Sequence, residues 1–93
     1  MNTYLLTFDQ ATASRRTVVA QIDRIREISN WMFFFDNAVC LISDESVERL
    51  TGLLRERLPE THFLVVKLEQ SKRGGWLRQS VWDFIKSPKP VNS

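Results

Sequence analysis

Two apolar runs separated by an Asp-Asn pair most constrain what this chain can fold into. The runs are Trp31–Phe35 and Ala38–Ile42, and both are rich in aromatic and branched residues. Asp36 and Asn37 between them tolerate the positive φ angles of a two-residue hairpin turn. Because neither run alternates with polar residues, we expect both faces of this hairpin to be buried and the hairpin to form the middle of a sheet.

Two further segments have the composition of strands. In Thr3–Phe8, Tyr4, Leu6 and Phe8 share one face of an extended chain. Phe63–Val66, followed by Leu68, is a nearly continuous apolar run that is short and branched. We expect it to be another buried strand.

Three segments space their apolar residues as helices do. The first follows Ser14 and Thr17, its candidate caps, and has its stripe at Val18, Ile22, Ile25 and Ile28. The second follows Ser43 and Asp44, again candidate caps, and has its stripe at Val47, Leu50, Leu54 and Leu58. The third, within 76–86, has its apolar residues at Leu77, Val81, Phe84 and Ile85.

The predicted order is strand, helix, two-stranded hairpin, helix, strand, helix. It indicates an α+β sandwich of the ferredoxin-like split βαβ type (βαββαβ) with an extra C-terminal helix. We expect one domain over residues 1–87 and a flexible tail over 88–93. Right-handed crossovers place the first two helices on one face, so the other face must be covered by the last helix, a second subunit, or both.

Composition limits the classes of protein to which the chain can belong. Its 93 residues, 43% hydrophobic and 26% charged, are typical of a single soluble domain. A net charge of +2 is far below that of a strongly basic nucleic-acid binder, so a nucleic-acid role requires the fold to cluster the charges. With no leader and no apolar run near the roughly 20 residues of a membrane helix, we expect a cytoplasmic protein and no membrane contact.

Cys40 and His62 are the single residues of their kinds. Together they cannot supply the ligands of a closed zinc site. Cys40 lies in an apolar run, so we expect a small core residue and not a reactive thiol. His62 has no Ser or Cys beside it in any motif, so nucleophilic catalysis is not supported.

Asp9 is the candidate catalytic and metal-binding residue. It stands at the exit of the first predicted strand, where its carboxylate could hold Mg²⁺ or Mn²⁺ for phosphodiester cleavage. One Asp offers fewer ligands than these ions usually take, so such a site requires a two-fold dimer that brings two copies of Asp9 around shared ions. The alternative is an Asp that ends the strand and caps the following loop.

Four basic residues are candidates for nucleic-acid contacts, namely Arg15, Arg16, Lys72 and Arg73. The first pair follows Asp9 and could clamp a phosphate. The second pair stands near Trp76, and a basic pair close to an aromatic ring could hold a phosphate and stack a base. The alternative role for Trp76 and Trp82 is packing against the sheet, and this is the role that we expect.

Several of these segments resemble known families. The opening of the chain resembles that of the small CRISPR-associated proteins of the adaptation complex and their VapD-like relatives, through Tyr4–Asp9 followed by Arg15-Arg16. The chain is more similar to short bacterial proteins of the SinR family, through Trp31–Asp44, Phe63–Leu68, Gly75 and Trp82. The resemblance implies a ferredoxin-like homodimer in which Asp9 matches the metal-binding Asp of the CRISPR-associated nucleases.

The sequence departs from that pattern at three places. Phe8 replaces the Tyr usual before the Asp, and Gln10 stands where an apolar residue is common. Trp76–Lys86 has helical spacing, whereas the CRISPR-associated proteins exchange a C-terminal strand between subunits. These departures bear on nuclease activity more than on the fold.

Two functions follow as expectations. The first is a nucleic-acid-associated dimer or a metal-dependent nuclease acting on RNA or DNA through paired Asp9. The second is a non-enzymatic antitoxin or immunity protein that binds and blocks a partner such as a toxin. Small size, nearly balanced charge and the lack of a catalytic cluster favour the second.

Overall fold

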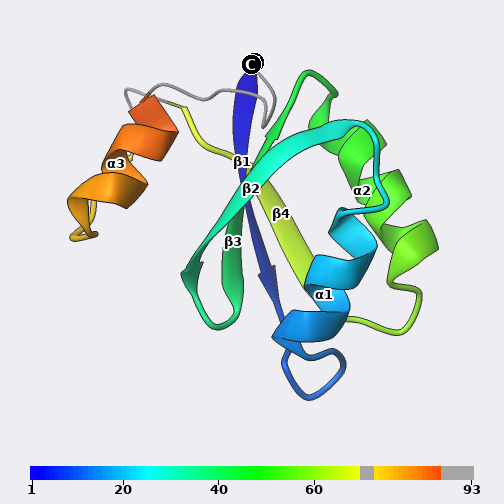
Figure 1. Cartoon of the computed structure of the whole chain (residues 1–93). Helices are drawn as coiled ribbons and strands as arrows, with labels where there is room; N and C mark the ends of the chain where they lie inside the picture. Colours follow the sequence, from blue (N-terminus) through cyan, green and yellow to red (C-terminus); the bar gives the residue numbers. More distant parts are fainter. Residues whose placement is uncertain (70–72, 87–93) are drawn as a thin grey trace.

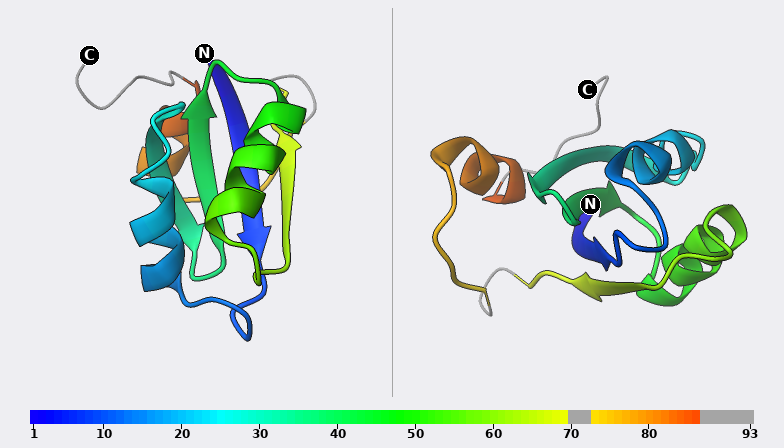
Figure 2. Two further views of the ribbon diagram at one scale, coloured as in Figure 1. Left: turned by 90° about the vertical axis from the view of Figure 1, so that its right-hand side faces the viewer. Right: turned by 90° about the horizontal axis from the view of Figure 1, so that it is seen from below.

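The structure is a computed structural model and describes residues 1–69 and 73–86. Its elements are β1 (Asn2–Phe8), α1 (Arg15–Ile22), β2 (Ile28–Phe35), β3 (Ala38–Ser43), α2 (Val47–Arg57), β4 (Phe63–Lys67) and α3 (Gln79–Lys86). Figure 1 and Figure 2 show α1 and α2 on one side of the sheet and α3 on the other. The predicted α+β class is confirmed, whereas the predicted tail at 88–93 lies outside the described residues.

The four strands form an antiparallel sheet in the order β2-β3-β1-β4. Each helix-connected pair of strands, β1 with β2 and β3 with β4, has a strand of the other pair between its members. This connectivity is compatible with the predicted ferredoxin-like arrangement. The predicted hairpin is therefore not the middle of the sheet, because β3 is central whereas β2 is an edge strand.

The hairpin turn forms at Asp36 and Asn37 as predicted, but without the predicted backbone conformation. No non-glycine residue among those described has a positive φ. The register of β2 against β3 instead shifts between Phe33 and Phe35, directly before the turn. Such an irregularity raises the local twist, which is what a positive-φ turn would otherwise supply.

Serine side chains cap the first two helices. Ser14 and Ser46 each accept a hydrogen bond from the backbone N–H three residues later, at 3.1 Å in both helices. The predicted cap of α2 at Ser43 or Asp44 is wrong. Ser43 is buried in β3 and donates its hydroxyl to the Glu27 carbonyl at 2.7 Å, so it joins the sheet to the connection before β2.

The apolar stripe predicted for the first helix is divided between a helix and a strand. α1 ends at Ile22, Ile25 lies in the following turns, and Ile28 begins β2. Ile25 and Ile28 are nevertheless buried, so the spacing predicted which residues face the core but not where the helix stops. Trp31 helps to hold the connection, because its Nε1 donates to Asp23 Oδ1 at 2.7 Å.

The main core lies between the sheet and the pair α1 and α2. Tyr4, Leu6 and Phe8 of β1 face it, as predicted from their alternation. They pack with a stripe from the helices that includes Val18, Ile22, Leu50 and Leu54. None of the described helices has both the length and the apolar character needed to cross a membrane.

The opposite face of the sheet is only half covered. Val81 and Ile85 of α3 pack with Cys40 of β3, and Met32 and Phe34 of β2 flank this second cluster. Over the other half of this face, β4 exposes Leu64 to 62% and Val66 to 39%. The prediction that Phe63–Val66 is a buried strand is wrong on this side, because α3 packs against the β2 half of the sheet.

Candidate functional site

Arg15 connects the start of α1 to the β2–β3 hairpin. Its guanidinium carbon lies 4.2 Å from the centroid of the Phe33 ring. Its Nη1 also lies 3.6 Å from Asp36 Oδ1, and both side chains of this ion pair are more than half exposed. A guanidinium has five N–H donors, so a side chain held in this way retains donors toward solvent.

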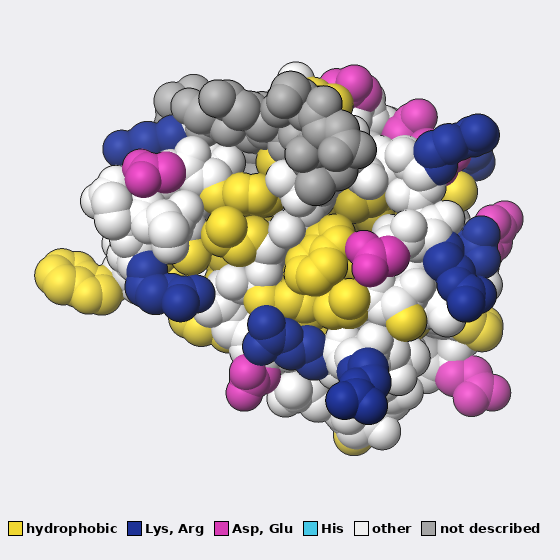
Figure 3. Space-filling view, viewed as in Figure 1, with side chains coloured by type: hydrophobic (Ala, Val, Ile, Leu, Met, Phe, Trp, Pro, Cys, Tyr) yellow, Lys and Arg dark blue, Asp and Glu magenta, His cyan; other side chains and the backbone are white. Residues whose placement is uncertain are grey.

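An aromatic pocket of about 280 Å³ lies where the end of β2 meets the segment before α3. We call it the hairpin pocket, and its lining residues are Phe34, Phe35, Trp76, Leu77, Arg78 and Val81. Phe35 is 59% exposed and Trp76 is 98% exposed. Figure 3 shows hydrophobic side chains gathered over β2 between α3 and α1, with Lys and Arg side chains along the lower rim.

The expectation that Trp76 and Trp82 both pack against the sheet is half right. Trp82 joins the cluster of α3 with β2 and β3. Trp76 does not, because it precedes α3 and stands almost entirely in solvent. An indole exposed to this degree gains nothing from burial, so it is the described aromatic side chain most available to a ligand.

A second, more polar pocket lies at the other end of the sheet, near the start of β1. We call it the N-terminal pocket, and it has a volume of about 360 Å³. Its cationic lining comes from Lys67 at the end of β4, Arg73 after it, and Lys86 at the end of α3. Glu69 is the single acidic residue among the described residues that line it.

The structure separates Arg15 and Arg16 from Arg73. Arg15 and Arg16 open α1, at the end of the sheet that holds the β2–β3 hairpin. Arg73 lines the N-terminal pocket at the opposite end. Lys72 lies outside the described residues. The basic pair predicted beside Trp76 is therefore represented by Arg73 alone, and it is Arg78 that shares a pocket with Trp76.

Asp9 has the geometry of a residue that caps a loop. Its Oδ1 accepts from the Ala11 N–H at 2.9 Å, and its carbonyl accepts from the N–H of Thr12 at 2.9 Å and of Ala13 at 3.2 Å. Its own N–H donates to the His62 carbonyl at 2.9 Å, which continues the pairing of β1 with β4. These bonds explain why an Asp is suited to this position without any metal.

The surroundings of Asp9 do not make a complete cation site within one chain. Among the described residues, no three His, Cys, Asp or Glu side chains come together in a group that could hold a metal ion. A hard cation usually takes six or more oxygen ligands, several of them from protein. A Mg²⁺ or Mn²⁺ site at Asp9 therefore still depends on a second chain, as the sequence indicated.

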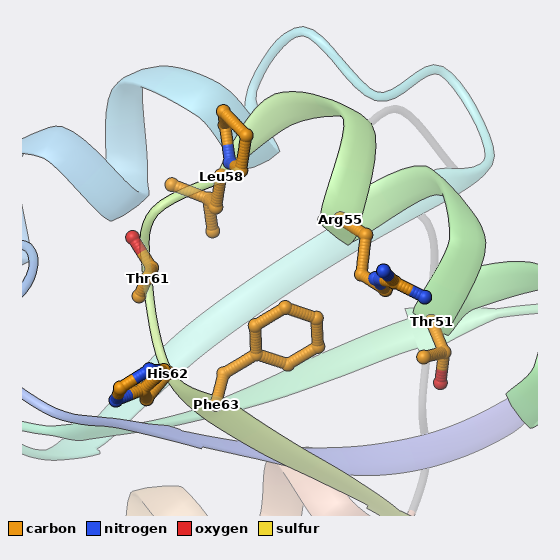
Figure 4. Close-up of a pocket in the computed structure, with 7 residues that line it drawn as sticks. Thr51, Arg55, Leu58, Thr61, His62 and Phe63 are labelled. Carbon is orange, nitrogen blue, oxygen red and sulfur yellow. The ribbon is translucent and has the colours of Figure 1, made fainter.

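A third pocket, of about 360 Å³, lies between the end of α2 and the start of β4. Figure 4 shows the Phe63 ring turned toward α2, with His62 on the other side of the strand from Arg55. The hydroxyl of Thr51 donates to the Val47 carbonyl at 2.7 Å and is engaged within its own helix. Among the described residues that line this pocket there is no carboxylate or thiol to pair with His62.

Cys40 is a core residue, as predicted. Its side chain is fully buried under α3. Burial raises the pKa of the thiol to about 12, although the positive charge of Arg73 lowers it in part. A thiol held neutral in this way is a poor nucleophile at physiological pH.

Sequence reasoning missed Phe35 and Arg78 as candidate ligand-binding residues. Phe35 was counted among the buried residues of a central strand, but it is the last residue of an edge strand. Arg78, which directly precedes α3, was not among the candidate residues. The one available signal was the aromatic and basic composition of 76–78.

Comparison of the chain with protein families, curated proteins and solved structures gives no match. The resemblance to the SinR family, the VapD-like proteins and the CRISPR-associated proteins thus stays a prediction.

Proposed function

We propose that this chain is a small cytoplasmic protein of ferredoxin-like topology that binds single-stranded nucleic acid at the hairpin pocket. The observation that carries the proposal is the exposure of Phe35 and Trp76 beside Arg78 in one pocket. The strand order and the two interleaved strand–helix–strand units support the assignment of topology.

The chemistry of the pocket suits an unpaired base. A base has an apolar face that can stack on an indole or phenyl ring, and such stacking does not depend on the base sequence. Single strands offer these faces, whereas a duplex keeps them stacked internally. We therefore expect an unpaired base to lie against Trp76, with Phe35 as the second aromatic wall.

Cations flank the aromatic wall. Arg78 lines the pocket and is exposed, so it can contact the phosphate that follows a stacked base. Arg15 stands on the other side of the hairpin end, held by Phe33 and Asp36. The small net charge of +2 means that these local cations, and not the protein as a whole, must attract the strand.

The test is a fluorescence anisotropy titration of labelled single-stranded DNA and RNA oligonucleotides at several salt concentrations. We expect Trp76→Ala to weaken binding about five- to 150-fold, since loss of one stacked base costs roughly 1–3 kcal/mol. Arg78→Ala should lower the slope of log K against log salt by about 0.7, the value for one phosphate contact on a single strand.

Arg57→Ala is the matched control for Arg78→Ala. It removes the same charge from an exposed position at the end of α2, remote from the hairpin pocket. The control should leave the salt slope unchanged if the contact is local. Absence of binding by the wild type at low salt, or equal effects of Arg57→Ala and Arg78→Ala, would contradict the proposal.

Two other predictions from the sequence stay predictions. Metal-dependent cleavage through Asp9 requires a second carboxylate-bearing chain. An antitoxin or immunity role requires a partner that co-purifies with the wild type. Cleavage assays in Mg²⁺ or Mn²⁺ and isolation of the chain from its native cell address these two functions separately.

A further inference from the structure

We propose that two copies of this chain associate by antiparallel pairing of their β4 strands, with Val65 facing Val65 of the second copy at a two-fold axis. The result is a continuous eight-stranded sheet. This inference is independent of nucleic-acid binding, because it uses the edge of the sheet farthest from β2 and the hairpin pocket.

The two edges of the sheet differ in their fitness for pairing. β2, at one edge, has register irregularities between Ile28 and Asn30 and between Phe33 and Phe35. Bulges of this kind protect an edge from pairing with another chain. β4, at the other edge, pairs with β1 in unbroken register over all of Phe63–Lys67. Figure 2 shows no described element beyond β4.

Hydrogen bonds to β1 determine which backbone groups of β4 face outward. The backbone groups of His62 and Leu68 point toward β1, since the Asp9 N–H donates to the His62 carbonyl at 2.9 Å and the Leu68 N–H donates to the Thr3 carbonyl at 2.8 Å. Along an antiparallel strand, the N–H and C=O groups of successive residues point alternately to the two neighbouring strands. The N–H and C=O groups of Phe63, Val65 and Lys67 therefore line the open edge.

A two-fold axis at Val65 satisfies all of these outward groups. Val65 pairs with its own copy, and Phe63 pairs with Lys67 of the other chain at both ends of the ladder. These are the closely bonded positions of an antiparallel pair, because each residue exchanges both its N–H and its C=O. A two-fold axis between the strands in this register leaves none of the three residues unpaired.

The side chains are self-complementary in the same register. Leu64 lies opposite Val66 of the second copy, and the axis repeats this pair. Leu64 and Val66 are the apolar side chains that α3 leaves exposed, at 62% and 39%. Cross-strand pairs of this kind stabilise a sheet and cover apolar surface. No two residues that face each other carry like charges, because Lys67 faces Phe63.

This dimer has a consequence for Asp9. Asp9 pairs with His62, and in the proposed register His62 lies opposite Leu68 of the other chain. The two copies of Asp9 are thus offset by about six residues along the strands, roughly 20 Å. The dimer does not create the paired Asp9 site that a shared metal ion requires, so the dimer and a nuclease with shared ions are mutually exclusive arrangements.

The first test places charged residues at the exposed apolar positions 64 and 66. We compare the wild type with Leu64→Lys/Val66→Lys and with Leu64→Glu/Val66→Glu by sedimentation equilibrium against the 10.9 kDa chain mass. The wild type should dimerise, and each double variant should dimerise at least about tenfold more weakly. An equimolar mixture of the two variants should form a heterodimer, because Lys then faces Glu at both repeated pairs.

The second test distinguishes edge pairing from contact between sheet faces. In the dimer, amide hydrogen exchange at Phe63, Val65 and Lys67 should slow as protein concentration rises. The amides of Leu64 and Val66 are bonded to β1 in either state and serve as internal controls. A monomeric wild type, a mixture that does not reassociate, or exchange at Val65 that is independent of concentration would each overturn the proposal.

Discussion

The Arg15 guanidinium lies over the Phe33 ring, 4.2 Å from its centroid, while the same ring meets Phe8 and Trp31 edge-on. Phe33 is thus shared between the main core and the basic start of α1. The contact fixes Arg15 against the end of β2, on the face of the sheet that α1 covers, and also contributes to stability.

Replacement of Arg15 should therefore affect folding as well as binding. We expect Arg15→Ala to lower the free energy of unfolding by about 0.5–1 kcal/mol, the range for an exposed cation–π contact. Arg16→Ala is the matched control at the next, exposed position, and its effect should stay within about 0.5 kcal/mol. Urea denaturation of both variants measures the difference, and equal losses would show that the Phe33 contact has no energetic role.

Alkaline pH should destabilise the protein through Cys40. Burial raises the pKa of its thiol from 9.0 to about 12, so above pH 9 the unfolded chain releases a proton that the folded chain keeps. The contribution of the thiol to the free energy of unfolding is complete below pH 9. It is lost between pH 9 and about 12, by at most about 1.4 kcal/mol per pH unit.

Cys40→Ala should flatten this pH dependence, although it also leaves a small void under α3. Burial raises the pKa of Tyr4 as well, so some loss of stability above pH 10 should remain in the variant. Denaturant titrations at pH 8 and pH 10.5 compare the two proteins. Identical pH dependence in the wild type and Cys40→Ala would show that the thiol is not shielded.

Asp9 should have a measurable structural role. Asp9→Ala removes the acceptor for the Ala11 N–H and should cost about 1 kcal/mol of stability, whereas Asp9→Asn keeps an acceptor oxygen and should cost less. The same variants test the nuclease prediction. Cleavage of RNA or DNA by the wild type in Mg²⁺ or Mn²⁺ that disappears in Asp9→Asn would establish a catalytic role that loop capping does not explain.

The N-terminal pocket should be secondary in nucleic-acid binding. Arg73 lies at the opposite end of the sheet from the hairpin pocket, and none of the described residues that line the N-terminal pocket is aromatic. We expect Arg73→Ala to lower the salt slope of oligonucleotide binding by less than the value of about 0.7 for one phosphate contact. A larger effect than that of Arg78→Ala would move the binding site to the N-terminal pocket.

Local sequence patterns predicted the helices and strands of this fold better than they predicted which side chains other elements would cover. The alternation of Tyr4, Leu6 and Phe8 and the stripe that includes Leu50 and Leu54 identified the buried faces, because periodicity depends only on neighbouring residues. The exposure of Leu64 could not be predicted in this way. It depends on which half of the sheet α3 covers, and α3 packs against β2 and Cys40 of β3.

The candidate site was less predictable than the fold for the same reason. Arg15 was identified from its proximity to Asp9 in sequence, but its contacts are with Phe33 and Asp36. Phe35 and Trp76 share a pocket only because α3 returns to the β2 edge of the sheet. A packing role for Trp76 was the natural expectation for an indole, and its exposure is a property of the tertiary arrangement.

Tryptophan emission during oligonucleotide titration tests the central claim most directly. Trp76 is 98% exposed, whereas Trp82 is packed against the sheet and the Trp31 indole N–H donates a hydrogen bond to Asp23. Base stacking on Trp76 predicts saturable quenching in the wild type that is absent in Trp76→Phe and retained in Trp82→Phe. Binding detected by anisotropy with unchanged emission, or with equal quenching in Trp76→Phe, would contradict the proposed site.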